Sequence, residues 1–436
     1  MRLAVIIGFS LCVFSLAGCS SALGSSVPEV RTAVQTTLSP TPKLISSQTL
    51  SACKNSNPSI QRHATSRLIY ISPTNTIWLW DKGQQPKQLT EFGGVIDLSI
   101  SKDGKIILFA RQFSVDQVEL WTISADRTGM RRLLSTVELS KMAGTTRSGV
   151  FPFFRSIEWE GNSHTFAFNR WSSLGSSTAT PDTFKIWKVN ADTRDTFVIG
   201  KGSFDYSPNG ELVLIYDDYG MGLYDADGDP YGSGKLPKYR AIDEHGRHIL
   251  IKPSWATDSE SFLIALPETS DVYQSGATFN IEQIWIRDQL IEDMGTFQGF
   301  ALSVNFSPDH KFMFYAKDAN LRPAELHLAD LQTDEDIIFS RQDDVSFDSW
   351  SPNSRDFIFD VEYAIRSGNV CDAQENTKLF PYLNSYAFIS WLDNTTLLVA
   401  DRAENWQIHF ESLGVHPEKT DLILALKYQG VSFQDP

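Results

Sequence analysis

The stretch Leu98-Ser99-Ile100-Ser101-Lys102-Asp103-Gly104 decides the fold, because close copies of it return along the chain. The clearest copies are Phe204-Asp205-Tyr206-Ser207-Pro208-Asn209-Gly210, Asn305-Phe306-Ser307-Pro308-Asp309 and Ser349-Trp350-Ser351-Pro352-Asn353, and degenerate ones begin at Trp159, Trp255 and Trp391. Pro presets φ for a tight turn, and Asp, Asn or Gly tolerates the conformations that follow. Each copy therefore predicts a short strand that ends in a tight turn.

An apolar strand follows most of these turns, as at residues 106–110 and 212–216. After it comes an aliphatic residue followed by an aromatic residue, His or Cys. This second pattern occurs eight times, spaced 37 to 66 residues apart, at Ile77-Trp78, Leu120-Trp121, Ile186-Trp187, Leu223-Tyr224, Ile284-Trp285, Leu326-His327, Val370-Cys371 and Ile408-His409. Four short strands in every unit of this repeat predict the blades of a β-propeller.

Turn, strand and Leu-Trp pattern together resemble the TolB-like, or WD40-like (PD40), repeat family over roughly residues 66–436. In that family a unit ends near Leu-Thr, and Gln88-Leu89-Thr90 matches that ending. The resemblance implies an all-β fold with a single propeller, whose loops recognise a partner.

The two ends of the repeat region predict how the ring closes. Residues 67–90 hold only the last three strands of a blade, whereas residues 430–436 look like an opening strand with nothing after it. We expect the C-terminal strand to complete the first blade, which removes exposed strand edges. This count gives eight blades, with seven as the alternative if one degenerate unit is not a full sheet.

Loop lengths predict one binding face. In a propeller, the loops after the second and fourth strands of each blade emerge on the same side, and the long insertions at 136–150, 172–183, 267–281 and 362–369 all follow such strands. Arg and aromatic residues are typical of binding hot spots. The candidate binding residues, all near the ends of second strands, are Arg111, Arg170, Trp171, Tyr363 and Arg402. The alternative is that they are solvated strand ends or internal ion pairs.

The N-terminal sequence predicts the cellular location of the protein. An apolar run at residues 3–16 is too short to span a bilayer as a helix, and it ends in Leu16-Ala17-Gly18-Cys19, which resembles the lipobox of bacterial lipoproteins. The resemblance implies that residues 1–18 are a signal peptide and that Cys19 carries a diacylglycerol, which anchors the protein on the extracytoplasmic side of the membrane. Ser20 is not the Asp of inner-membrane retention, which favours the outer membrane where a cell has one. The alternative is a plain secretory signal.

The rest of the chain divides into a tether and a folded body. Ser, Thr and Pro make up half of residues 20–51, so we expect residues 19–52 to be a flexible tether and residues 53–436 to be the propeller domain. Cys53 and Cys371 remain after processing, and export favours their oxidation. Cys371 is expected on a third strand; a disulfide between the two and a pair of free thiols are both open.

Several kinds of chemistry are disfavoured. The net charge of -15 argues against a nucleic-acid partner. The sequence contains no Gly-x-Ser-x-Gly, His-Glu-x-x-His or phosphate-loop motif. The segment Asp225-Ala226-Asp227-Gly228-Asp229 resembles the start of a calcium loop, but Pro230 stands where that loop needs Gly. We therefore expect a tight turn there, with no metal and no cofactor.

These observations favour a monomeric, non-catalytic binding or scaffolding module for a protein, peptide or glycan partner. One alternative is a carbohydrate-active hydrolase or lyase in the central pocket, which a cluster of perturbed carboxyls or a metal at the axis would favour. Another is an envelope assembly factor without a small-molecule site, which a broad apolar patch would favour.

Overall fold

The structure is a computed structural model that describes part of the chain. That part lies within the unit formed by residues 44–436. It comprises residues 67–72, 74–81, 84–114, 117–142, 152–172, 185–217, 220–232, 236–237, 253–268, 276–299, 304–318, 323–341, 346–361, 364–380, 386–391, 396–401, 407–412, 419–425 and 431–433. Cys19, Cys53, Tyr363 and Arg402 lie outside these ranges.

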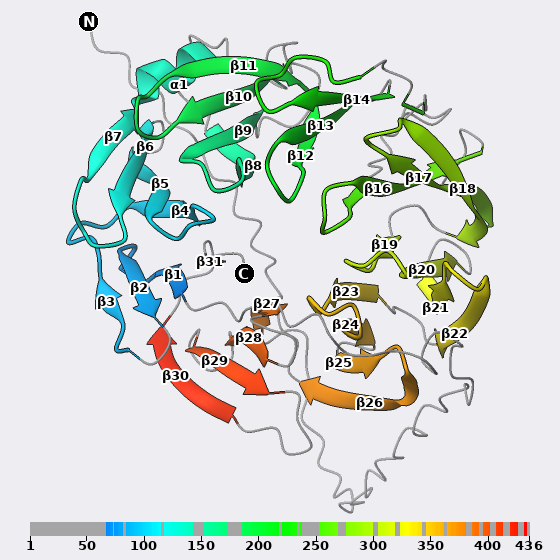
Figure 1. The fold of residues 1–436 in the computed structure, drawn as a ribbon. Helices are drawn as coiled ribbons and strands as arrows, with labels where there is room; N and C mark the ends of the chain where they lie inside the picture. The colour runs from blue at the N-terminus through cyan, green and yellow to red at the C-terminus, as the bar shows by residue number, and fades with distance from the viewer. Residues whose placement is uncertain are drawn as a thin grey trace, which may run out of the picture. The chain divides into compact units, whose positions relative to one another are not determined.

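The fold is a β-propeller. Its described strands form eight antiparallel sheets, which follow one another in chain order (Figure 1). Sheet 1 contains β1 (Arg67–Ile71), β2 (Ile77–Asp81), β3 (Lys87–Gln88) and β31 (Val431–Phe433). Sheet 2 contains β4 (Val95–Ile100), β5 (Ile106–Ser114), β6 (Gln117–Ser124) and β7 (Arg131–Leu134). Sheet 3 contains β8 (Pro152–Trp159), β9 (Thr165–Ser172), β10 (Lys185–Asn190) and β11 (Thr196–Lys201). Sheet 4 contains β12 (Ser203–Tyr206), β13 (Leu212–Asp217) and β14 (Gly220–Asp225).

The second half of the chain repeats the same layout. Sheet 5 contains β15 (Ser254–Trp255), β16 (Ser261–Pro267), β17 (Ala277–Trp285) and β18 (Leu290–Gly299). Sheet 6 contains β19 (Asn305–Phe306), β20 (Phe312–Asp318), β21 (Pro323–Asp330) and β22 (Glu335–Arg341). Sheet 7 contains β23 (Ser346–Trp350), β24 (Asp356–Val361), β25 (Ala364–Asn369) and β26 (Asp372–Phe380). Sheet 8 contains β27 (Tyr386–Trp391), β28 (Thr396–Asp401), β29 (Gln407–Ser412) and β30 (Lys419–Ala425).

The core lies between neighbouring sheets. One cluster of buried side chains joins sheets 1 and 2, and another joins sheets 2 and 3. Further clusters join sheets 3 and 4, sheets 4 to 6, and sheets 6 and 7. A central strand that is covered on both faces is apolar along its length rather than alternating. This explains why Ile107, Leu108, Phe109 and Ala110 of β5 are all buried.

A buried serine organises the repeated turn that the sequence predicted. Ser101, Ser207, Ser307 and Ser351 are fully buried. Each hydroxyl donates to the Asp or Asn side chain two residues later, over 2.5 to 2.8 Å. Each also accepts from the backbone N–H five residues later, over 2.9 to 3.0 Å. The hydroxyl thus joins the end of the first strand of a sheet to the start of the second strand across the turn.

Tryptophans that end first strands link one sheet to the sheet before it. The indole Nε1 of Trp159 donates to Oγ of Ser99 over 2.9 Å. Trp350 donates in the same way to the Asn305 carbonyl over 3.2 Å. Trp255 and the Asp205 carbonyl form a longer version at 3.4 Å. In these three sheets the tryptophan before the turn therefore connects neighbouring sheets.

The last strand lies beside the first. β31 pairs antiparallel with β1, with Ile69 opposite Ser432 and Leu68 opposite Phe433. This is the pairing that the missing opening strand of the first blade predicts.

Two expectations about the insertions were wrong in part. Residues 136–150 are not all loop, because α1 (Thr136–Met142) begins there. The N–H and hydroxyl of Ser135 donate to the Glu138 carboxylate over 2.7 and 2.6 Å, and the Glu138 N–H donates back to the serine Oγ over 3.3 Å, so a capping box starts the helix.

In the seventh sheet, residues 364–369 form the third strand, β25, rather than a loop. Cys371 therefore lies in the turn after β25, and not on a third strand as expected. The cause is a strong local turn, in which the Asn369 side chain accepts from the Cys371 N–H over 2.9 Å and donates to Asp356 over 2.6 Å.

Candidate functional site

The five residues of the predicted binding face are described to different degrees. Arg111 lies on β5 with its side chain described, whereas Arg170 and Trp171 are placed on β9 by the backbone alone. Arg111, Arg170 and Lys317 each stand ten residues after the residue that opens the turn of their sheet. The repeat thus puts a cation at the same place in sheets 2, 3 and 6.

The Arg111 guanidinium lies between two aromatic rings. Its Cζ is 3.8 Å from the centroid of the Phe92 ring and 4.4 Å from that of Phe113. Nε is buried and has no hydrogen-bond partner in the described part of the chain. Burial lowers the pKa of Arg111, and the charge of Glu119 on the next strand raises it. An arginine keeps its charge at neutral pH.

Glu119 is the obvious partner for Arg111, because the two residues are opposite each other on β5 and β6. Its carboxylate is already engaged, however. It accepts from Arg132 over 3.0 Å and from the Trp121 indole over 3.1 Å. Among the described residues, Arg111 consequently forms no ion pair.

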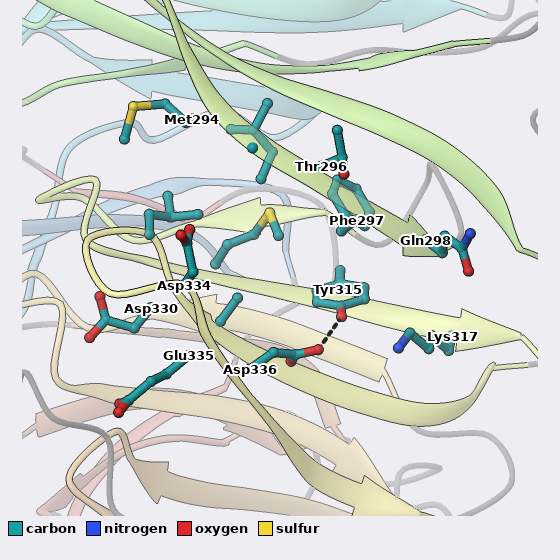
Figure 2. Close-up of a pocket in the computed structure, with 15 residues that line it drawn as sticks. Met294, Thr296, Phe297, Gln298, Tyr315, Lys317, Asp330, Asp334, Glu335 and Asp336 are labelled. Atoms are coloured by element: carbon teal, nitrogen blue, oxygen red, sulfur yellow. Dashed lines mark hydrogen bonds between the residues drawn. The ribbon is translucent and has the colours of Figure 1, made fainter.

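A second candidate site is a cavity of about 460 Å³ between sheets 5 and 6. Its larger apolar lining residues come from both sheets and are Ile281, Met294, Phe297, Met313 and Leu331. The polar residues around it are Thr296, Gln298, Tyr315, Lys317, Asp330, Asp334, Glu335 and Asp336. Figure 2 shows Lys317 at one end, Asp330, Asp334 and Glu335 toward the other, and the Tyr315 hydroxyl facing Asp336 between them.

A polar network, in which Tyr315 and His327 are buried and Asp336 is exposed, forms one side of this cavity. Tyr315 donates its hydroxyl proton to Oδ2 of Asp336 over 2.6 Å (Figure 2). His327 is 3% exposed; its Nδ1 is 3.1 Å from Oδ1 of Asp336, and its Nε2 is 3.2 Å from Oε2 of Glu325. Arg341 extends the network through an ion pair, with its Nε 3.0 Å from Oε1 of Glu325. The network runs from the cavity to the outer strand of sheet 6.

The network holds charge close to the cavity. Burial opposes ionisation of Asp336, yet hydrogen bonds from His327 and Tyr315 keep its pKa below the ordinary value. Burial, reinforced by the hydrogen bond to Asp336, raises the pKa of Tyr315. At neutral pH the cavity therefore presents an ionised Asp336 beside a neutral phenol.

Sheet 2 has different residues at the positions that correspond to the network of sheet 6. The counterparts of Tyr315 and His327, counted from the turn serine, are Phe109 and Trp121. Glu119 and Arg132 form the same outer ion pair as Glu325 and Arg341. Sheet 6 thus has a Tyr and a His where sheet 2 has a Phe and a Trp, and it has an additional Asp beside them. Sequence reasoning placed His327 in the repeat and missed its role, although a His in a column of mostly Trp and Tyr was a usable signal.

A larger cavity, of about 560 Å³ between sheets 1 and 2, contains mostly paired charges. Arg67 pairs with Asp81 over 2.6 Å. His164 lies between Asp192, at 2.8 Å, and Asp103, at 3.3 Å. By contrast, Lys317 and Asp334 of the cavity in Figure 2 form no ion pair within the described part of the chain. We therefore regard the larger cavity as structural.

Two carboxyls on first strands are perturbed. Burial raises the pKa of Asp97 on β4 to about 6, although the Leu98 N–H donates to its carboxylate over 2.8 Å. Burial likewise raises the pKa of Asp348 on β23. First strands are the innermost strands of a propeller, and Figure 1 draws β4 and β23 toward the middle. Perturbed carboxyls therefore do occur on the axis side.

Three further observations concern metals, membranes and cysteines. Within the described ranges, no group of three His, Cys, Asp or Glu side chains could hold a metal ion. In the same ranges no helix has the length and apolarity needed to cross a bilayer. Cys371 is disulfide-bonded, and its partner lies outside the described residues, so pairing with Cys53 stays a prediction.

Comparison with known proteins yields structural likeness only. No family model matches the chain, and no curated protein matches it. TolB from Acinetobacter baumannii is 14% identical with a TM-score of 0.31, and the match covers 64% of this chain and 64% of TolB.

Two other solved structures cover more of the chain. A eukaryotic initiation factor is 12% identical with a TM-score of 0.48, over 86% of this chain and 99% of that one. An oligogalacturonate lyase in complex with manganese is 11% identical with a TM-score of 0.40, over 82% and 88%. At such identities the likeness concerns the fold, and the assignment as a propeller rests on the sheets themselves.

Proposed function

We propose that the protein is an extracytoplasmic, membrane-anchored lipoprotein whose propeller is a non-catalytic binding module for a protein, peptide or glycan partner. The observation that carries the binding role is the Tyr315–Asp336–His327 network beside the cavity between sheets 5 and 6. The anchoring rests on the sequence alone, through the lipobox at Cys19.

The buried part of the network, Tyr315 and His327, is costly for the fold. Buried polar and charged groups give up hydration, and replacing them by packed apolar groups is often neutral or stabilising. Sheet 2 forms the same strands with Phe109 and Trp121, so the repeat itself does not require Tyr315 and His327. A polar network that folding does not need, beside a cavity that is partly lined by apolar side chains, is the usual character of a binding site.

The charges favour one of the three partner classes. Four carboxylates and a single Lys surround the cavity, and the whole chain carries a net charge of -15. Such a field attracts cations. A basic side chain has an apolar stem as well as a charged tip, and Met294, Phe297 and Met313 offer the surface for such a stem. A basic segment of a peptide or protein is the partner that fits best.

Selection of random heptapeptides on the purified protein tests this role. The proposal predicts enrichment of peptides with a Lys or Arg beside an apolar residue. For the best such peptide, Tyr315→Phe and Asp336→Asn weaken binding by about tenfold, the worth of one charge-assisted hydrogen bond. Asp288→Asn, which removes the same charge at an exposed position, leaves it unchanged. Equal affinities for Asp336→Asn and Asp288→Asn refute the site, and circular dichroism confirms that each variant is folded.

A hydrolase or lyase in the central pocket is the second candidate function. It is favoured by the raised pKa of Asp97 and of Asp348 on first strands, because a carboxyl whose pKa is raised toward neutral pH is better suited to act as a general acid. Turnover of an oligosaccharide that is lost in Asp97→Asn, and kept in Asp288→Asn, would establish it in place of the binding role.

A further inference from the structure

We propose that Arg111, held between Phe92 and Phe113, is a receptor for a carboxylate group, separate from the cavity between sheets 5 and 6. This inference does not depend on the binding role of that cavity. It concerns a different sheet and a ligand of opposite charge.

The two rings restrict the guanidinium. They lie 3.8 and 4.4 Å from Cζ, so the side chain has already lost the rotational freedom that binding would otherwise cost. Nε is buried, but the terminal nitrogens are not among the buried unpartnered atoms and form no hydrogen bond with the described residues. An oriented guanidinium edge with unused N–H groups matches the two oxygens of a carboxylate.

The backbone is also shaped for this stack. Gly94 has a φ of +88°, and a Cβ built on it would lie 2.6 Å from the Gln112 carbonyl oxygen. Only glycine lets the loop that carries Phe92 come this close to β5; the Gln112 N–H donates to the Gly94 carbonyl over 2.8 Å. The arrangement around Arg111 is therefore specified by the sequence at several positions.

A structural role explains Arg111 less well. Arginines on strands usually stabilise a sheet by pairing with the opposite carboxylate, but Arg132 and Trp121 already engage Glu119. A stacked aliphatic side chain would cover Phe92 without burying an unpartnered Nε, which has an energetic cost. The unused N–H groups point to a ligand.

The nearby groups favour a carboxylate over a phosphate. Glu119 across the strand already contributes one negative charge to the surroundings of Arg111, and the net charge of -15 adds to the repulsion of a dianion. Phe113 is 49% exposed, which offers an apolar contact beside the carboxylate. The ligand class is thus an apolar carboxylate, such as the C-terminal residue of a peptide.

Titration of the full-length protein with benzoate, benzamide and inorganic phosphate tests the proposal. The readout is the ¹⁵N–¹H signal of Arg111 Nε, identified as the one that Arg111→Lys removes. We expect benzoate to shift this signal in a saturable manner, with affinity on the order of millimolar for so small a ligand. Benzamide has the same shape without the charge and is expected to leave the signal in place.

Variants separate this site from general charge effects. Arg111→Lys is expected to weaken benzoate binding, measured calorimetrically, by about tenfold, and Phe113→Leu by less. Arg287→Lys, at an exposed position, is expected to change nothing. The proposal is overturned if benzoate and benzamide act alike, if phosphate binds more tightly than benzoate, or if Arg287→Lys weakens binding as much as Arg111→Lys. None of these outcomes bears on peptide binding between sheets 5 and 6.

Discussion

Replacing Asp97 by Asn is expected to stabilise the protein at neutral pH. Burial raises the pKa of this carboxyl from 3.8 to about 6, so the native state binds the proton more tightly than the unfolded state does. Stability is therefore lost as the pH rises from about 4 through about 6, and the loss is complete at pH 7. At about 1.4 kcal/mol per pKa unit, the ionised carboxyl costs up to roughly 3 kcal/mol.

Asn removes that charge with little change in shape. Its side-chain oxygen can still accept the bond that the Leu98 N–H donates over 2.8 Å. Urea unfolding at pH 7, followed by tryptophan fluorescence, is expected to show Asp97→Asn more stable than the wild type by about 1–3 kcal/mol. At pH 4, where the native carboxyl is protonated in the wild type, the two proteins are expected to have nearly the same free energy of unfolding.

Asp126→Asn is the matched control. This exposed carboxylate accepts two hydrogen bonds from Thr128, which lower its pKa. Its stabilising effect is present above the unfolded pKa and is lost on acidification, so the substitution gives no gain at pH 7. If Asp97→Asn shows no gain at pH 7 over pH 4, or if Asp126→Asn shows the same gain, the reasoning about burial on the first strand is wrong.

Three further predictions concern the N-terminus, the cysteines and the turns. Cys19→Ser is expected to abolish incorporation of a clickable fatty acid in a bacterial host, and continued labelling of that variant would exclude Cys19 as the lipid site. Peptide mapping without reduction is expected to join Cys371 to Cys53; a free Cys53 thiol would exclude that pairing. Gly210→Ala is expected to lower the free energy of unfolding by at least about 1–3 kcal/mol, because φ is +77° and the new Cβ would meet the Gly161 backbone; an unchanged urea midpoint would contradict this.

The fold could be predicted because its determinants are local. The buried serine of each turn bonds only to residues up to five positions away, so the motif carries its structure wherever it occurs. The helix α1 was also within reach, since Ser135 and Glu138 have the spacing of a capping box. Residues 364–369 were mistaken for a loop because Val370-Cys371 imitates the third-strand pattern, whereas the pairing of β24 with β25 decides the matter.

The candidate sites could not be predicted in the same way, because they depend on contacts between strands and between sheets. Asp336 and Tyr315 are 21 positions apart and meet only through the registers of β20, β21 and β22. The cavity exists because sheet 5 packs beside sheet 6, which no single motif encodes. Arg111 was identified from its place at the end of a second strand, but its stack with Phe92 requires the loop between two sheets.

The pairing of the last strand with the first tests the account most directly, because the predicted closure of the propeller depends on it. In the register observed, Ile69 is opposite Ser432. Ile69→Cys combined with Ser432→Cys is expected to form a disulfide in the folded protein, detected by peptide mapping. Ile69→Cys with Val431→Cys puts the thiols on opposite faces and is expected to form none. Equal cross-linking in both pairs, or in neither, would contradict the closed propeller.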